Sequence, residues 1–280
     1  MRVIKTVDEM QLAIRENRLV GRKIALVPTM GALHEGHLSL IEQAKESADV
    51  VVVSIFVNPT QFGPSENFAN YPRDEKRDLG ICEEKGVDFV FVPDESELFP
   101  EDHTIVVDEK EVSKTLCGVS RPTHFRGVAT ICAKLFNITM PDYVIVGMKD
   151  AQQAVLINRL IRNLHFPIEL IIGGTVRDED GLALSSRNQQ LSDTQRAEAL
   201  KIYQALCSGL ALTKKGITNC DRIIAEVTNQ MGNSLRLRVI YVKTVDLESM
   251  KEIREVVPGQ TLLAVAAWVD QVRLIDNVRL

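Results

Sequence analysis

Residues 24–37 read Ile-Ala-Leu-Val-Pro-Thr-Met-Gly-Ala-Leu-His-Glu-Gly-His, and this stretch decides how the rest of the chain is interpreted. The run from Ile24 to Val27 is typical of a buried strand, and the apolar periodicity that begins at His37 predicts a helix. Between them, Gly31 and Gly36 let the backbone come close to a ligand, and the amides that open a helix favour a bound phosphate. The stretch therefore predicts an anion site at the end of a strand.

The same alternation of apolar runs and amphipathic segments continues through the first two-thirds of the chain. Apolar runs separated by helices predict a parallel sheet covered on both faces, with ligands at the carboxyl ends of its strands. The expected strands are 24–27, 50–57, 88–92, 143–146 and 168–172, and the expected helices include 37–47, 74–85 and 151–163.

The pattern changes after residue 172, where a polar segment precedes two helical stretches and three strand-like runs. Their closeness in sequence predicts an antiparallel sheet with helices on one side. We expect an α/β chain with a Rossmann-like nucleotide- and substrate-binding domain, residues 1–175, and a smaller α+β lid domain, residues 176–280. The expected C-terminal helices are 193–213 and 219–232, and the expected strands are 236–245, 261–269 and 271–275.

The composition is that of an ordinary globular protein, with 280 residues, 45% hydrophobic and 25% charged. A net charge of -5 creates no general field for nucleic acid or an anionic membrane, so any anionic ligand must be held locally. The N-terminal residues lack a signal-peptide pattern, and we expect a cytoplasmic protein. The five cysteines are widely spaced and form no C-x-x-C pair, which predicts reduced thiols.

His34 and His37 are three residues apart, so both could reach one phosphate group from the first turn of a helix. Zinc binding is an alternative, but no third ligand lies nearby, and hydrolytic zinc helices usually carry H-E-x-x-H. The chain has neither a G-x-x-x-x-G-K-[ST] loop nor a G-x-G-x-x-G turn. A nucleotidylyltransferase type of H-x-G-H site remains.

Three further segments follow strands or lie near the expected domain boundary. The hydroxyls and guanidinium of Ser185-Ser186-Arg187 suit phosphate oxygens, and Lys149 can neutralise phosphate charge. Asp150 could cap a helix or hold a ribose hydroxyl, whereas the amides of Asn58 and Gln61 could orient a hydroxy acid. Each segment alone could instead be an exposed turn or helix start.

Taken together and in this order, these motifs resemble the pantothenate synthetase (pantoate–β-alanine ligase) family. The resemblance implies a Rossmann-like nucleotidylyltransferase fold and an enzyme that joins pantoate to β-alanine while ATP is cleaved to AMP and pyrophosphate. It also implies a cytosolic homodimer that needs Mg²⁺, whose ligands we do not assign. The matching stretches are 28–37, 54–62, 71–73, 124–128, 149–153 and 176–188.

The same resemblance implies roles for individual residues. His37 would be the proton donor and His34 would support the phosphates, with Lys149 and Arg187 completing the catalytic group. Gln61 and Gln153 would hold pantoate, Gln61 also being near β-alanine, with Asn58 beside them as a further candidate. The expected ATP contacts are Met30, Gly31, Ala32, Leu33, His34, Glu35, Gly36, His37, Gly147, Met148, Lys149, Asp150, Val176, Leu184, Ser185, Ser186 and Arg187.

Three positions depart from the family pattern without removing a group that the chemistry needs. Val146 replaces a usual aromatic residue, Thr123 a common glycine and Gly174 a usual proline.

Two other functions are compatible with the H-x-G-H motif or with the same kind of sheet. They are a nucleotidylyltransferase acting on a phosphorylated substrate and a noncatalytic nucleotide-binding regulator. An aminoacyl-tRNA synthetase is disfavoured because no basic domain for tRNA is present.

Overall fold

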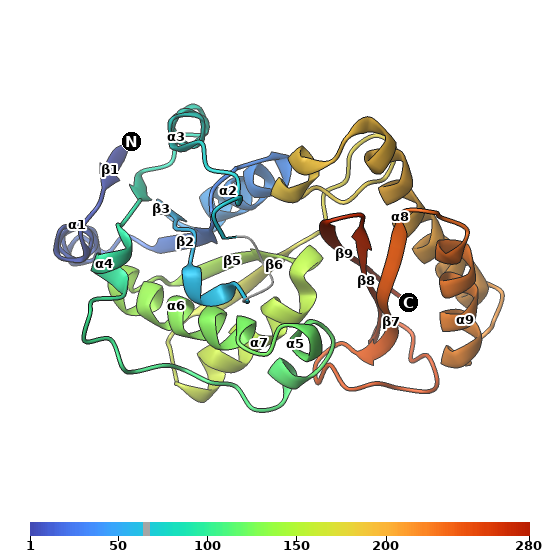
Figure 1. Cartoon of the computed structure of the whole chain (residues 1–280). Helices are drawn as coiled ribbons and strands as arrows, with labels where there is room; N and C mark the ends of the chain where they lie inside the picture. Colours follow the sequence, from blue (N-terminus) through green and yellow to red (C-terminus); the bar gives the residue numbers. More distant parts are fainter. Residues whose placement is uncertain (64–67) are drawn as a thin grey trace.

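The larger of two sheets is built from six parallel strands, and its strand order fixes where a ligand can bind (Figure 1). The computed structural model describes residues 1–63 and 68–280. From β2 the chain moves outward to β3 and β4, and it later crosses to β5 and β6 on the other side, so the switch point lies between β2 and β5. The order is β1 (Arg2–Ile4), β4 (Phe89–Phe91), β3 (Val50–Ile55), β2 (Ile24–Thr29), β5 (Tyr143–Gly147) and β6 (Glu169–Gly173).

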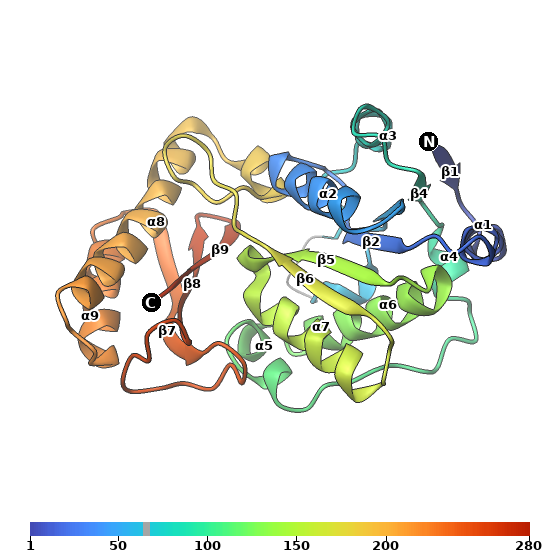
Figure 2. The same cartoon turned by 180° about the vertical axis from the view of Figure 1, so that it is seen from behind.

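Helices cover both faces of this sheet (Figures 1 and 2). One face packs against α1 (Val7–Leu19), α6 (His124–Thr139) and α7 (Ala151–Asn163), and the other against α2 (Glu35–Ser47) and α3 (Glu75–Glu84). Successive residues from Ile24 to Val27 of β2 point to opposite faces and are all buried, which explains the continuous apolar run in the sequence. Two short helices, α4 (Glu95–Leu98) and α5 (Cys117–Ser120), lie in the long connection before α6.

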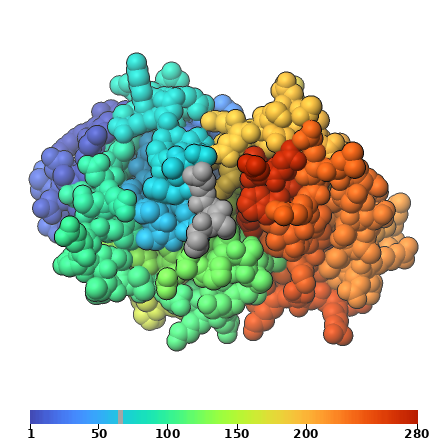
Figure 3. All heavy atoms as spheres, viewed as in Figure 1, coloured from blue at the N-terminus to red at the C-terminus, as the bar shows by residue number. Residues whose placement is uncertain are grey.

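The C-terminal third forms the expected α+β unit and lies beside the N-terminal part of the chain (Figure 3). Its antiparallel sheet has the order β7 (Leu237–Asp246), β8 (Thr261–Val269) and β9 (Val272–Arg279), with α8 (Asp193–Lys214) and α9 (Cys220–Gly232) packed against it. Val245 and Leu262 belong to the same buried cluster as α6 and α7, so the two sheets share part of one core. Within the described ranges, no helix combines the length and apolarity needed to cross a bilayer.

The fold class and the expected helices and strands are confirmed, most of them within about two residues at each end. The sequence patterns did not predict β1, α1, α4, α5 and α6, and they placed the end of β9 at Ile275 rather than Arg279. Most residues of α6 are buried, so it has no wide polar stripe, and Thr123 at its start makes no side-chain capping hydrogen bond. The usual signals of an amphipathic, capped helix are therefore weak there.

Candidate active site

One cavity opens at the switch point between β2 and β5 and gathers residues from distant parts of the chain. The segment between β6 and α8 closes it on one side, and Arg273, Leu274 and Ile275 of β9 form part of its wall. The expected site residues that line it are Met30, His34, Gly36, His37, Gln61, Gly147, Lys149, Asp150, Gln153, Val176, Leu184, Ser185, Ser186 and Arg187.

Six expected contacts do not line this cavity: Gly31, Ala32, Leu33, Glu35, Asn58 and Met148. Asn58 is fully buried, and its amide donates to the Gly127 carbonyl at 3.1 Å while its oxygen accepts from Thr60. The side chain of Asn58 therefore holds the turn after β3 against α6 rather than facing a substrate.

The loop after β2 is held by a carboxylate that the sequence analysis did not identify. Asp78 of α3 is 1% exposed and accepts from the amides of Ala32, at 2.7 Å, and Leu33, at 2.8 Å. Burial raises the pKa of Asp78, although these two hydrogen bonds act in the opposite direction. The protein's own carboxylate therefore occupies these two loop amides, and the expected ATP contacts of Ala32 and Leu33 stay predictions.

The backbone of this loop is strained in a way that Asp78 supports. Gly31 has φ +77° and Ala32 has φ +51°, the left-handed region that non-glycine residues rarely adopt. A Cβ on Gly31 would lie 2.9 Å from Asp78 Oδ2, so glycine is required both for the conformation and for the close approach. The hydrogen bond to Ala32 offsets part of the cost of its conformation.

His34 is the N-cap of α2 and His37 lies in its first turn. Each imidazole accepts a hydrogen bond from a backbone amide of this turn. The His34 amide donates to His37 Nδ1 at 3.3 Å, and the Gly36 amide donates to His34 Nδ1 at 3.1 Å. Because each Nδ1 accepts, the hydrogen-bond network assigns the ring proton to Nε2 in both histidines. Their ring centroids are 4.1 Å apart, so the two rings present their remaining donors side by side at the cavity.

Both imidazoles are neutral at physiological pH. Burial lowers the pKa of His34 to about 4 and that of His37 to about 3, and the positive charge of Lys149 acts in the same direction. Each ring is therefore an uncharged hydrogen-bond donor. A bound triphosphate would raise both pKa values because it brings negative charge within reach.

The depressed pKa values predict how stability depends on pH. Between pH 6.5 and about 4 the unfolded chain takes up protons on these histidines that the folded chain does not, so the free energy of unfolding falls as the pH drops. Urea titrations from pH 7 to pH 4.5 should show a shallower fall for the double variant His34→Gln/His37→Gln than for the unmodified chain. Parallel curves would contradict the assignment.

The turn after β5 contributes the opposite charges of Lys149 and Asp150. Lys149 Nζ lies 3.7 Å from Asp150 Oδ2, and both side chains line the cavity. Burial acts to raise the pKa of Asp150, but the charges of Lys149 and Arg187 outweigh it and hold that pKa below its usual value. Of the two roles considered for Asp150, the structure does not show capping of α7, because the side chain makes no capping hydrogen bond; the contact with a ribose hydroxyl stays a prediction.

The segment between β6 and α8 brings Ser185, Ser186 and Arg187 to the other side of the cavity. The Ser186 hydroxyl lies 3.0 Å from the phenol oxygen of Tyr71, and the Arg187 guanidinium lies 6.0 Å from the Tyr71 ring centroid. Burial raises the pKa of Tyr71, so its hydroxyl stays protonated and can take part in this contact as a donor. Tyr71 thus holds the start of the C-terminal part against the larger sheet.

Gln61 and Gln153 line the cavity. The backbone carbonyl of Gln61 is contacted by the first residue of α6 and by a residue just before that helix. Arg121 donates to the Gln61 carbonyl at 3.2 Å, and His124 Nδ1 lies 2.9 Å from the same oxygen.

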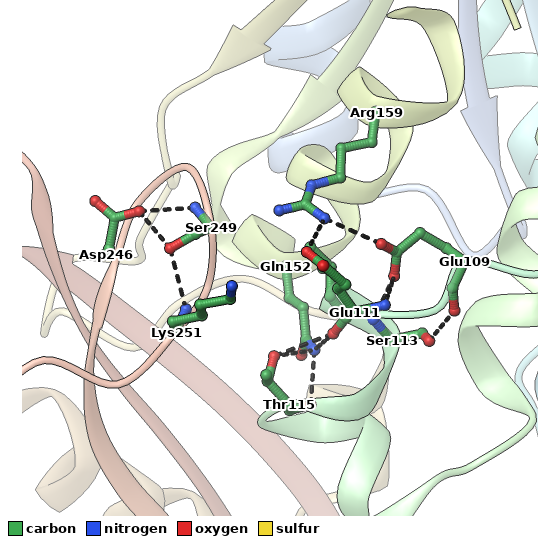
Figure 4. A network of polar contacts seen from close by, with 10 residues as sticks. Glu109, Glu111, Ser113, Thr115, Gln152, Arg159, Asp246, Ser249 and Lys251 are labelled. Carbon is green, nitrogen blue, oxygen red and sulfur yellow. Dashed lines mark hydrogen bonds and ion pairs between the residues drawn. The ribbon is translucent and has the colours of Figure 1, made fainter. Parts of the chain in front are cut away.

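Gln152, the neighbour of Gln153, does not line the cavity and makes structural contacts instead (Figure 4). Its amide donates to the Val112 and Thr115 carbonyls at 2.7 Å each, which anchors residues 112–117 to α7.

The cavity is electropositive although the whole chain is acidic. Among the described residues, its lining holds four permanent cations, Arg121, Lys149, Arg187 and Arg273, against one carboxylate, that of Asp150. Charges on walls of low dielectric constant act strongly on a ligand between them. The site therefore suits a ligand with several negative charges, and it adds Tyr71, Arg121, His124 and Arg273 to the residues expected from the sequence.

The three departures from the family pattern lie at or near this site. Val146 is 6% exposed and Gly174 is part of the cavity wall, whereas Thr123 begins α6. A Cβ on Gly174 would meet nothing within 4 Å, so no steric constraint requires glycine there.

Comparison with known proteins gives consistent matches over the whole chain. A family model for pantoate-beta-alanine ligase matches residues 2–279. Pantothenate synthetases from Thermosipho melanesiensis and Fervidobacterium nodosum are 47% and 46% identical, each alignment covering 99% of both chains.

Two solved structures extend the comparison to three dimensions. Pantothenate synthetase from Thermus thermophilus has a TM-score of 0.95 at 38% identity, with 100% of this chain and 99% of that chain covered. Pantoate-beta-alanine ligase from Francisella tularensis, complexed with beta-gamma ATP and beta-alanine, has a TM-score of 0.82 at 33% identity, with 100% and 97% covered.

Proposed function

The chain belongs to the pantoate-beta-alanine ligase family, and from this premise we propose that it joins pantoate to β-alanine through a pantoyl adenylate, with cleavage of ATP to AMP and pyrophosphate. The observation that carries this proposal is the pairing of two kinds of groups in one cavity. Cations and N–H donors, suited to a triphosphate, lie beside the two amides of Gln61 and Gln153, suited to a small polar acid.

The first step needs no protein nucleophile. A pantoate carboxylate oxygen attacks the α-phosphorus of ATP, the bond from that phosphorus to the bridging oxygen breaks, and pyrophosphate leaves. The site must align the reactants and stabilise the charge that moves onto pyrophosphate. Lys149 and Arg187 supply positive charge for this purpose, and His34 and His37 supply neutral Nε2–H donors.

In the second step the uncharged amine of β-alanine attacks the acyl carbon of the adenylate. The carbon–oxygen bond to AMP breaks, AMP leaves and the new amide nitrogen loses a proton. Gln61 and Gln153 would fix the acyl group for this attack and keep water from competing.

The family resemblance also implies Mg²⁺. The described ranges contain no group of three or more His, Cys, Asp or Glu side chains arranged to hold a metal ion. Mg²⁺ bound with a nucleotide commonly takes one or two carboxylates in addition to phosphate oxygens, and Asp150 fits that donor set. When bound, the ion would offset negative charge on the phosphates, and Asp150 would hold it beside Lys149.

We propose that residues 1–175 and 176–280 move as two bodies hinged near Gly174. Arg177 supports this division because it forms a bidentate ion pair with Asp276 of β9, at 2.7 and 2.9 Å, and so belongs with the C-terminal sheet. Closure would bring Ser186 and Arg187 onto ATP. By family resemblance alone, the chain would also act as a cytoplasmic homodimer.

The proposed function is tested by incubating the purified protein with ATP, Mg²⁺ and pantoate and following AMP and pyrophosphate with and without β-alanine. Pantothenate and AMP formed in equal amounts only with both substrates would support the ligase. Transfer of a nucleotide to a phosphorylated acceptor would identify a nucleotidylyltransferase instead, and ATP binding without turnover would identify a regulator.

Replacing Gln61 by alanine should separate the acid site from the nucleotide site. Gln61 lines the same cavity as Gln153, so we expect KM for pantoate to rise about tenfold or more while the Kd for ATP changes less than about twofold. Initial rates and calorimetric titration with ATP measure the two quantities. An equal loss of ATP affinity would place Gln61 at the nucleotide.

A further inference from the structure

The last strand of the chain reaches the turn that carries Lys149. Asn277 of β9 is 7% exposed, and its side-chain amide donates to the carbonyls of Met148, at 3.1 Å, and Lys149, at 3.0 Å. One carboxamide thus holds two consecutive peptide groups that are about 130 residues away in sequence. Both carbonyls belong to the 3-10 turn between β5 and α7, Met148–Asp150.

This turn depends on support from outside itself. Its own acidic residue, Asp150, makes no side-chain capping hydrogen bond to α7. Lys149 must point into the cavity from a turn of only three residues, so the orientation of its peptide groups decides where its ammonium group lies. A small rotation of the turn would move the end of this long side chain much farther than its Cα.

Asn277 is itself fixed from several directions. Its backbone pairs with Ala264 of β8, and its backbone amide donates to Asp276 Oδ1 at 2.7 Å. Asp276 in turn accepts hydrogen bonds from Arg177 at the start of the C-terminal part. The position of the Lys149 turn is therefore tied to the same strand as the segment that carries Ser186 and Arg187.

We infer that Asn277 is a positioning residue: it sets the place of Lys149 at the phosphates and makes that place depend on the docking of the C-terminal sheet. Lys149 would be held for ATP only when β9 is seated against the larger sheet. The inference rests on the proposed function for the identity of the nucleotide.

The test is a double-mutant cycle on ATP affinity, measured by calorimetry without pantoate. The neutral variant Asn277→Ala removes both donors, and we expect it to raise the Kd for ATP about tenfold. In a Lys149→Met background the same substitution should change the Kd less than about twofold, because its effect acts through Lys149. Thr244→Ala is the matched control: Thr244 is also buried, in β7, and its hydroxyl donates to the Ile253 carbonyl, and it does not line the cavity.

If Asn277 has a merely structural role, Asn277→Ala should raise the Kd for ATP by the same factor in the unmodified chain and in the Lys149→Met background. That result would overturn the inference, and so would an unchanged Kd for ATP in folded Asn277→Ala. If Asn277→Ala does not fold, Asn277→Ser keeps one hydroxyl donor and should give a smaller but still Lys149-dependent increase. Pyrophosphate release by the unmodified protein is measured separately, so failure of the ligase assignment remains distinct from failure of the coupling.

Discussion

Substitution of Lys149 by methionine is expected to lower pantoate-dependent pyrophosphate release by about a thousandfold, the largest effect at this site. Lys149 is the cation on the β5 side of the cavity, and its side chain is only 18% exposed. Methionine has a similar length but no charge, so the packing changes little while the stabilisation of departing pyrophosphate is lost. Single-turnover measurement of pyrophosphate release isolates this step from product release.

A matched control is Lys201→Met on α8, where the lysine forms an i,i+3 ion pair with Glu198 and does not line the cavity. Its activity should stay within about twofold of the unmodified chain. A similar loss in both variants would mean that overall charge, not the position of Lys149, sets the rate. A well-folded Lys149→Met variant with an unchanged rate would remove Lys149 from the mechanism.

Substitution of His37 by alanine is expected to lower adenylate formation by roughly a hundredfold. The change removes an Nε2–H donor at the phosphates, and it also removes the Nδ1 acceptor of the His34 amide. Two polar variants separate these losses. Asparagine can keep the acceptor near the helix start, whereas glutamine can extend a donor N–H toward the position of Nε2.

If His37 acts as a neutral donor, His37→Gln should retain more activity than His37→Asn. If it transfers a proton, both variants should be as slow as alanine, because neither amide can act as an acid. The pH profile of kcat/KM gives a second test. With a pKa of about 3 in the free protein, His37 should produce no loss of activity near pH 6.5.

The sequence predicted most of the parts of the site because its motifs follow directly after strands. His34, His37, Lys149 and Gln61 each follow a strand end by no more than eight residues, and parallel strands bring those ends to one edge. The contact that holds the amides of Ala32 and Leu33 could not be predicted, because its acceptor lies on α3, far from this loop in the sequence.

The supporting residues could not be predicted in the same way. Asp78 lies on a helix about 45 residues from the loop that it holds, and Asn277 lies on β9, about 130 residues from the turn that carries Lys149. As isolated residues, each is typical of an exposed polar position, and only the tertiary packing buries them. The length of β9 was underestimated for a related reason: polar Asp276 and Asn277 interrupt the apolar pattern because Asp276 pairs with Arg177 and Asn277 bonds the turn after β5.

The contacts of the Asp78 carboxylate also mean that the H-x-G-H segment cannot be transferred alone into another protein and keep its conformation. Transplanting residues 30–37 onto another Rossmann-like sheet would carry the two histidines and the left-handed turn, but not the acceptor that holds the amides of Ala32 and Leu33. Such a graft would need α3, or an equivalent acid at the same depth, to keep the turn in place. The smallest portable unit of this site is therefore a strand, a loop and two helices, not the short motif by which it is recognised.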